Sequence, residues 1–425
     1  MNHLNGCDAA HQRLLTLAEA LNTARTLIQP IRDTETVALP EAYDRVLATD
    51  LAAQCDAPPH DNSAMDGFAL YQADLQPGEP TRLRIVGQAL AGHPYSGSVP
   101  RGAAVRITTG GLIPDGPDVV IMQEHCFIAP DQSRIEIDAA TSARIERGEN
   151  IRRRGEDVRA GTVLLAGGQR LRPQDVALAA GQGIAALEVV RRLRVAVAST
   201  GDELCEPGRA LPPGAIYESN RYALIGLLRR WGCAVTDLGI LRDDRETLRT
   251  AFHDAAASHD VVLTSGGVSV GTADWVKAVI AELGNIEFWR LAIKPGKPVA
   301  FGRIQDCLVL GLPGNPVSVL VTFLMFARPL LLARMGATPV EPLRLRVIAE
   351  FSWRRQPGRR EWLRARLQPD SAGGWRALMY PNNSSGALSS LVWAEGLVEL
   401  PEECAGVTPG DPVDYLPFSG LGIGY

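Results

Sequence analysis

The fold is constrained most strongly by an alternation of apolar runs and helical patterns between residues 192 and 335. The run Val195–Ala198 is continuous, as expected for a strand that is buried on both faces. One helix is predicted from its N-cap Ser219 to a stop at Gly232, and another over 245–258. Strands that alternate with helices predict a parallel sheet in a three-layer α/β domain. The predicted strands are Val195–Ala198, Val235–Leu241, Val261–Leu263 and Cys307–Leu312.

Different patterns flank this domain. An amphipathic helix is predicted over 13–29 and a second helix over Pro40–Ala53. Short apolar runs between Gly, Pro and Asp turns indicate a β-rich module over 54–150. In the tail, apolar residues alternate with Arg364 and Arg366, which predicts strands with one charged face, as in a small barrel or sandwich.

The patterns together predict a multidomain α/β plus β chain. We expect a discontinuous, elongated N-terminal linker domain (12–53 and 151–190), a β-rich inserted domain (54–150), an α/β domain (191–338) and a C-terminal small β-barrel (339–425).

Charge, cysteine and hydropathy patterns exclude several classes of protein. The net charge is -5 and no region concentrates Lys and Arg, so a nucleic-acid partner is not expected. The seven cysteines are scattered without a C-x-x-C pair, which argues against a disulfide framework or a zinc knuckle. The start lacks the features of a signal peptide, and the longest apolar stretch, Val317–Ala327, is too short to span a bilayer. We therefore expect a cytoplasmic protein with no membrane partner.

The loops after the predicted strands are the best candidates for chemistry, because ligands of a parallel sheet bind outside the carboxyl ends of its strands. The loop Ser265–Asp274 contains three glycines, which allow positive φ and let backbone amides surround a phosphate. The other loops are Ser199–Leu204, Arg242–Asp244 and Gly311–Pro316. Simple turns, or carboxylates at a helix N-terminus, are the alternative interpretation of each loop taken singly.

Charged residues of both signs come with these loops. Glu203, Asp243 and Asp274 would meet at one sheet edge, near Lys294 and Lys297 of a Pro/Gly-stiffened segment. Carboxylates beside a phosphate cradle suit Mg²⁺, which takes a few protein oxygens plus substrate phosphates. The residues alone thus predict a site for a phosphorylated small molecule and a metal, although the lysines could simply be solvated.

A second polar cluster is expected in the β-rich module. It combines Pro58–Gly67, Thr108–Gly111 and the segment Glu149–Asp157 with its three consecutive arginines. Turns and a solvated face would explain these residues. Binding of an oxyanion is the sharper hypothesis, since the planar arginine fork matches such groups.

In this order, the segments resemble the molybdopterin molybdenumtransferases, which are the MoeA family and the matching C-terminal domain of gephyrin. The resemblance rests on Asp61–Gly67, Thr109-Gly110, Arg152–Asp157, Ser199–Leu204, Ser265–Asp274, Lys294–Pro298 and Leu312–Pro316. It implies a homodimer of four-domain subunits with the active site between chains. It also implies a Mg²⁺-dependent reaction in which adenylylated molybdopterin is hydrolysed, AMP leaves, and molybdenum from molybdate is placed on the dithiolene sulfurs.

The resemblance also implies roles for individual residues. Those expected in catalysis are Asp61, Thr109, Asp157, Glu203, Asp243, Asp274, Lys294 and Lys297, with Glu203, Asp243 and Asp274 as the metal ligands. Those expected to bind the pterin substrate are Ser265, Gly266, Gly267, Ser269, Gly271, Arg290, Pro313, Gly314, Asn315, Pro316 and Ser385. Two positions depart from the family pattern: Arg290 stands where lysine is expected, and Gly111 where alanine is more usual.

The expected partners are a second copy of the chain, a molybdopterin adenylyltransferase, and molybdoenzymes or their chaperones. Three other functions stay open at this point. They are adenylylation of molybdopterin, a non-catalytic scaffold like that of gephyrin, and a phosphosugar or nucleotide enzyme on the same α/β architecture.

Overall fold

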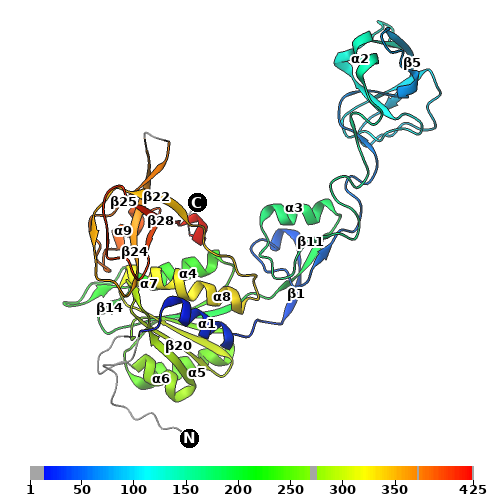
Figure 1. The fold of residues 1–425 in the computed structure, drawn as a ribbon. Coiled ribbons are helices and arrows are strands. Elements are labelled where there is room, and N and C mark those ends of the chain that lie inside the picture. Colours follow the sequence, from blue (N-terminus) through cyan, green and yellow to red (C-terminus); the bar gives the residue numbers. More distant parts are fainter. Residues whose placement is uncertain (1–13, 269–274, 371–372, 424–425) are drawn as a thin grey trace. The chain divides into compact units, whose positions relative to one another are not determined.

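The computed structural model describes residues 14–268, 275–370 and 373–423, which form two compact units (Figure 1). The larger unit consists of Met1–Ala48, Gly168–Arg172 and Glu188–Tyr425, and the smaller unit of Thr49–Gly167 and Pro173–Leu187. The segments 12–53 and 151–190, predicted as one discontinuous domain, are divided between the two units. Each unit is described by itself.

A six-stranded sheet forms the centre of the larger unit, in the order β16-β13-β17-β21-β20-β18. Four strands are parallel, as predicted: β13 (Arg194–Thr200), β16 (Ala234–Leu241), β17 (Val261–Ser265) and β21 (Cys307–Leu312). At one edge the sheet continues with two antiparallel strands that the sequence analysis did not identify, β20 (Pro298–Ile304) and β18 (Asn285–Arg290). The carboxyl ends of the four parallel strands therefore lie at a common edge.

Helices cover both faces of this sheet (Figure 1). One layer consists of α1 (Leu17–Leu27), α4 (Asn220–Arg230), α7 (Pro316–Thr322) and α8 (Arg328–Arg334); the other consists of α5 (Arg245–Ser258) and α6 (Trp275–Leu283). The strand residues Val195 and Val197 pack into the first layer, and Ala196 and Val262 into the second. The predicted three-layer α/β domain is confirmed, since alternate residues of the buried strands face different helices.

Among the described residues, one helical run, Pro316–Arg334, is long and apolar enough by composition to cross a membrane. It comprises α7, the π-helical segment Phe323–Ala327 and α8. About two thirds of its apolar stretch, 67%, is buried inside the protein. Its side chains, such as Phe326 and Leu330, belong to the main core cluster, so the run serves as a core helix.

The tail forms the predicted small barrel. Its strands are β22 (Leu345–Ala349), β24 (Arg360–Pro369), β25 (Trp375–Met379), β26 (Gly396–Leu400) and β28 (Pro412–Pro417). They close into a ring in the order β24-β25-β22-β28-β26, because β26 also pairs with β24. A short strand before the tail, β19 (Ile293–Lys294), adds to β24 and joins the barrel to the α/β domain by backbone hydrogen bonds.

The smaller unit is rich in β-structure, as predicted. Its sheet has the order β7-β4-β6-β5-β9-β8, with β4 (Gly67–Leu70), β5 (Thr81–Ala89), β6 (Ala103–Ile107), β7 (Val119–Met122), β8 (Cys126–Ile128) and β9 (Arg134–Ile137). Helices α2 (Ala139–Arg144) and α3 (Pro173–Gly181), and the short pairs β3 (Asn62–Ser63) with β10 (Ile151–Arg152) and β2 (Leu51–Ala52) with β11 (Val163–Leu165), complete it.

The prediction of a helix over Pro40–Ala53 is wrong. Only a 3-10 turn, Leu39–Glu41, forms there. Asp44 then takes a positive φ of 62°, which an α-helix does not accommodate. Val46 and Leu47 go on to form isolated β-bridges with Arg170 and Val189. Pairing with distant segments has overridden the weak helical preference of this stretch.

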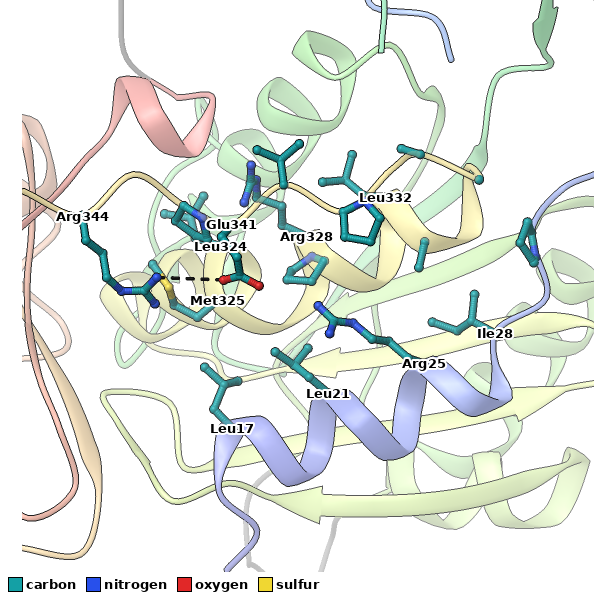
Figure 2. Close-up of a pocket in the computed structure, with 18 of the residues that line it drawn as sticks. Leu17, Leu21, Arg25, Ile28, Leu324, Met325, Arg328, Leu332, Glu341 and Arg344 are labelled. Atoms are coloured by element: carbon teal, nitrogen blue, oxygen red, sulfur yellow. Dashed lines mark ion pairs between the residues drawn. The ribbon is translucent and has the colours of Figure 1, made fainter. Parts of the chain in front are cut away.

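An apolar groove of about 400 Å³ runs between α1 and α8 (Figure 2). Leu17, Leu21 and Ile28 of the α1 segment face Leu324 and Leu332 across it. At one end, the ion pair between Arg344 and Glu341 comes from the segment before the barrel. The groove follows the helical layer and does not lie at the carboxyl ends of the parallel strands, where ligands of such sheets bind.

Candidate functional site

A second cavity, of about 450 Å³, opens at the carboxyl ends of the parallel strands. Every strand-end loop singled out in the sequence contributes to it. Its lining includes Gly201 and Glu203 after β13, Asp243 after β16, Ser265–Val268 at the end of β17, and Pro313–Asn315 after β21. The structure thus brings loops from four separate parts of the chain to one wall.

Two of the three predicted metal ligands, Glu203 and Asp243, lie in this cavity. The buried Oδ1 of Asp243 has no hydrogen-bond partner among the described residues. Burial raises the pKa of Asp243 above its ordinary value, and the negative charges of Asp202, Glu203 and Asp244 raise it further. The third predicted ligand, Asp274, lies outside the described residues.

Mg²⁺ fits this arrangement, although the described residues contain no group of three His, Cys, Asp or Glu side chains that could hold a metal. An unpaired buried carboxylate oxygen next to other acidic side chains leaves negative charge uncompensated, and a divalent cation would compensate it. Mg²⁺ usually takes one or two protein carboxylates and completes its shell with water and phosphate oxygens. Glu203 and Asp243 can supply the two protein carboxylates.

The glycines after β17 form the expected cradle. Gly266 and Gly267 have φ values of +91° and +66°. A Cβ at Gly267 would be 2.6 Å from the Oγ1 of Thr200, and a Cβ at Gly266 would overlap the backbone oxygen of Thr200. Both positions therefore require glycine for conformation and for space.

One amide of the predicted cradle already has a backbone partner. The Gly266 amide donates a hydrogen bond to the carbonyl oxygen of Leu312, at 3.1 Å. Because this N–H already holds the end of β17 against β21, it is not available to a phosphate. The phosphate-binding role of the Gly267 amide stays a prediction, and Ser269 and Gly271 lie outside the described residues.

Asn220, the first residue of α4, also lines the cavity, and the sequence analysis missed it. Its Nδ2 donates to the Oγ of Ser265 at 2.8 Å and to the carbonyl oxygen of Gly314 at 2.6 Å. The Ser265 hydroxyl in turn donates to the carbonyl oxygen of Pro313 at 3.3 Å. The only signal in the sequence was an asparagine directly after the N-cap Ser219, which periodicity does not distinguish from an ordinary helix start.

The predicted lysines lie beside the barrel. The Nζ of Lys294 is 2.9 Å from the Oε1 of Glu361, a carboxylate that is only 1% exposed. Lys297 is exposed, and its neighbour Pro298 lines the cavity. The structure therefore gives Lys294 a structural partner that the sequence did not reveal, while Lys297 stays at the rim. Arg290 ends β18, where its backbone pairs with Pro298.

The loop that carries Ser385 is held at the start of α7, because the Val317 amide donates to the Ser385 carbonyl oxygen at 3.0 Å. Under this loop lies Arg364, which is 1% exposed. Its guanidinium donates to Asn382 and Ser384 carbonyl oxygens, and burial lowers its pKa to about 10. Among the described residues no carboxylate lies within ion-pair distance of Arg364, but the nearby negative charge of Glu361 acts against the effect of burial on its pKa.

Arg364 also corrects an expectation. The alternation in the tail predicted a charged strand face that carries Arg364 and Arg366. The outer face of β24 is instead covered, since Trp362 on the same face belongs to the main core cluster. A two-residue period shows which residues share a face, but not what covers that face.

The polar cluster of the smaller unit is also assembled. Asp61 accepts hydrogen bonds from the Nη1 of Arg153 at 2.7 Å and from the Arg154 amide at 2.8 Å. The backbone hydrogen bond from Arg154 is the largest cause that lowers the Asp61 pKa. The backbone amide and Oγ1 of Thr109 both donate to Asp66, at 2.6 and 2.9 Å. The exposed Asp157 follows on the same loop as the arginines.

Comparisons with known proteins cover nearly the whole chain. Family models match at residues 15–183 (MoeA N-terminal region, domain I and II), 196–333 (probable molybdopterin binding domain) and 346–418 (MoeA C-terminal region, domain IV). The chain is 38% identical to the molybdopterin molybdenumtransferase of Haemophilus influenzae over 96% of this chain and 100% of that protein. It is 40% identical to that of Synechococcus elongatus over 89% of this chain and 93% of that protein.

Comparison with a solved structure agrees with these sequence matches. The molybdopterin biosynthesis moeA protein of Pyrococcus horikoshii OT3 superimposes with a TM-score of 0.82 at 31% identity, over 95% of this chain and 100% of that one. Sequence and structure agree over all the described domains. The chain therefore belongs to the MoeA family of molybdopterin molybdenumtransferases, which are transferase enzymes.

Proposed function

We propose that this chain takes part in molybdenum cofactor biosynthesis by inserting molybdenum into adenylylated molybdopterin, with release of AMP. The relatives named above are molybdopterin molybdenumtransferases. The observation that carries the proposal is the shared cavity wall of Glu203, Asp243 and the glycine cradle, in which the Asp243 carboxylate has an unpaired buried oxygen. Such a wall suits a diphosphate that arrives with a divalent cation.

The residues of the cavity would have different roles in the reaction. Glu203 and Asp243 would hold Mg²⁺, with Asp274 as a further predicted ligand. When bound, Mg²⁺ would draw negative charge from the pyrophosphate link and so ease its cleavage. The Gly267 amide would donate to a phosphate oxygen, which orients the link without a side chain in the way. Fixed donors of this kind stabilise developing charge because they need no reorganisation.

Molybdate, the second substrate, is an oxyanion, so its site would need cations. Lys297 at the rim and the buried Arg364 under the Ser385 loop supply positive charge beside the start of α7. Lys294 adds a third charge that is shared with Glu361. The Arg364 guanidinium donates to the loop that carries Ser385, so its positive charge would add to the electrostatic attraction of an oxyanion. We propose that these groups bind molybdate.

The proposal extends to assembly and cell compartment. The residues expected in catalysis fall in two separate compact units, with Asp61, Thr109 and Asp157 in the smaller one. This division supports a homodimer in which the smaller unit of one subunit completes the site of the other. A molybdopterin adenylyltransferase would supply the substrate, molybdoenzymes or their chaperones would receive the product, and the reaction would occur in the cytoplasm.

The test is a direct assay. Purified protein is mixed with adenylylated molybdopterin, Mg²⁺ and molybdate, and both AMP and active cofactor are measured. Glu203→Gln and Asp243→Asn should each abolish AMP release. Asp254→Asn is the matched control, since Asp254 is an exposed carboxylate of α5 outside the cavity. Normal AMP release by both acidic-site variants would refute the proposal. AMP incorporation from Mg·ATP and molybdopterin would point to adenylylation instead.

A further inference from the structure

The loop between β21 and α7, Pro313–Asn315, has two of its carbonyl groups held in place. The Pro313 carbonyl oxygen accepts from the Ser265 hydroxyl, and the Gly314 carbonyl oxygen accepts from Asn220. A carbonyl oxygen can only accept, so the Asn220 amide must turn its Nδ2 toward Gly314. The Ser265 hydroxyl donates to Pro313, so it accepts the second hydrogen of Nδ2. The direction of each hydrogen bond among Asn220, Ser265, Pro313 and Gly314 is therefore fixed.

These fixed carbonyls determine where the neighbouring amides point. The peptide bonds of the loop are trans, and in a trans peptide the N–H points opposite to the C=O. The Pro313 carbonyl faces Ser265, so the N–H of Gly314 points away from Ser265. The Gly314 carbonyl faces Asn220, so the N–H of Asn315 points away from Asn220. Both residues line the cavity, and in the described part of the chain neither amide has a hydrogen-bond acceptor.

Asn220 is itself held rigidly. The buried carboxylate of Glu218 accepts from the Arg221 amide at 2.8 Å and from the hydroxyl of Ser199 at 2.9 Å. This anchors the start of α4 to the end of β13. The Nδ2 of Asn220 thus connects three elements, namely α4, the end of β17 and the loop before α7.

We propose that Asn220 is a positioning residue that presents the Gly314 and Asn315 amides as a pair of donors to a phosphate group. Two successive N–H groups without protein acceptors, in residues that line one cavity, can donate to the same anion. The ligand class is a phosphate or diphosphate ester. This inference rests on the proposed function and adds a phosphate subsite to the cavity that Glu203 and Asp243 also line. Ser265 holds the neighbouring carbonyl, that of Pro313, so it positions the loop as well.

The experiment compares wild type with Asn220→Ala, Asn220→Asp and the control Ser219→Ala. Ser219 is the N-cap of α4, but its side chain makes no capping hydrogen bond, so the control disturbs the same helix start without touching the loop. Binding of AMP and of inorganic pyrophosphate is measured by calorimetry with Mg²⁺ present. KM, kcat and Tm are measured alongside.

We expect Asn220→Ala to bind both ligands roughly tenfold more weakly, the scale of one hydrogen bond to a charged group. Asn220→Asp should be weaker still, because its carboxylate cannot donate and repels the phosphate. KM should rise while kcat stays within about threefold, since the amides contact the phosphate before and during reaction. A role limited to folding would instead lower Tm and kcat and leave KM unchanged. Equal binding by wild type and both Asn220 variants would overturn the inference.

The inference and the proposed function can fail separately. If wild type binds pyrophosphate but releases no AMP from the adenylylated substrate, and the variants lose pyrophosphate binding, the phosphate subsite stands and the proposed reaction fails. If wild type releases AMP and the Asn220 variants keep its KM, the positioning role fails and the reaction stands. If wild type binds neither AMP nor pyrophosphate, the phosphate subsite is refuted, and AMP release from the adenylylated substrate still decides the reaction.

Discussion

Replacing Asp243 with asparagine should make the ligand-free protein more stable while it weakens Mg²⁺ binding. The Asp243 carboxylate has a buried oxygen without a partner and three acidic neighbours. An unsatisfied buried polar group lowers the free energy of unfolding by about 1–3 kcal/mol. Asparagine still has one side-chain oxygen at this position, but it removes the negative charge. The new amide can also donate to the Asp202 or Glu203 carboxylate. We expect the free energy of unfolding to rise by about 1 kcal/mol, and Tm by roughly 2 °C.

The effect should depend on pH with a definite sign. The folded-state pKa of Asp243 is raised, so the folded protein holds this proton to higher pH than the unfolded chain does. The wild type therefore loses stability as pH rises through the folded pKa. The advantage of Asp243→Asn should be complete near pH 7 and should disappear below roughly pH 4, where the carboxyl is protonated in both states.

Thermal unfolding from pH 4 to pH 8, with and without Mg²⁺, measures both effects. Mg²⁺ should raise the Tm of wild type in proportion to the logarithm of its concentration above Kd, and should raise that of the variant less. Asp254→Asn, on the exposed face of α5, is the control for removal of one negative charge. If Asp243→Asn unfolds at a lower temperature than wild type at pH 7, or gains the same stability from Mg²⁺, the reasoning about an uncompensated charge is wrong.

Three further predictions concern residues that hold the strands and loops around the site in place. Asp260→Asn should destabilise the protein by about 3 kcal/mol in denaturant titration at pH 7, because the 4% exposed Asp260 accepts two hydrogen bonds from Arg191. Its pKa is lowered, with the Arg191 hydrogen bond the largest of the causes that act against burial, so this stabilisation should fade as pH falls below roughly 4. Gly266→Ala should leave the circular dichroism spectrum unchanged but reduce AMP release at least roughly tenfold, because its methyl would overlap the backbone oxygen of Thr200 and displace the cradle. Normal kinetics would contradict the close approach. Lys294→Met should lower the free energy of unfolding by roughly 1 kcal/mol, because it removes a partner of the buried Glu361. The double variant with Glu361→Gln should regain stability but not molybdate affinity. If molybdate affinity is also regained, the role of Lys294 is structural alone.

Most of the α/β architecture could be predicted from the sequence, because buried parallel strands and amphipathic helices have different hydrophobic periods. The candidate site followed from the same pattern, since the carboxyl ends of parallel strands must meet. The antiparallel strands β18 and β20 were missed, because a hairpin-like pair at a sheet edge has no crossover helix to reveal it.

The unpredicted parts of the site depend on contacts between distant segments. The burial of Arg364 requires that the loop before Ser385 and the core beside Trp362 cover a strand face that looks charged in sequence. The role of Asn220 requires that α4 start next to the loop that carries Gly314. Local periodicity contains no information on either contact, because each joins residues that are 20 to 94 positions apart.

The position of α1 has a consequence for the order in which the chain folds during synthesis. This helix begins the described chain, yet Leu17, Ala20 and Ala24 belong to the same core as Leu324 and Leu331, about 300 residues later. A ribosome that adds roughly 5–20 residues per second needs about 15–60 s to make that partner. Throughout this interval the apolar stripe of α1 lacks its partners in α8 and the segment before it. A nascent chain stalled before residue 316 should therefore bind a chaperone at its N-terminal end, and should release it once α8 has left the exit tunnel.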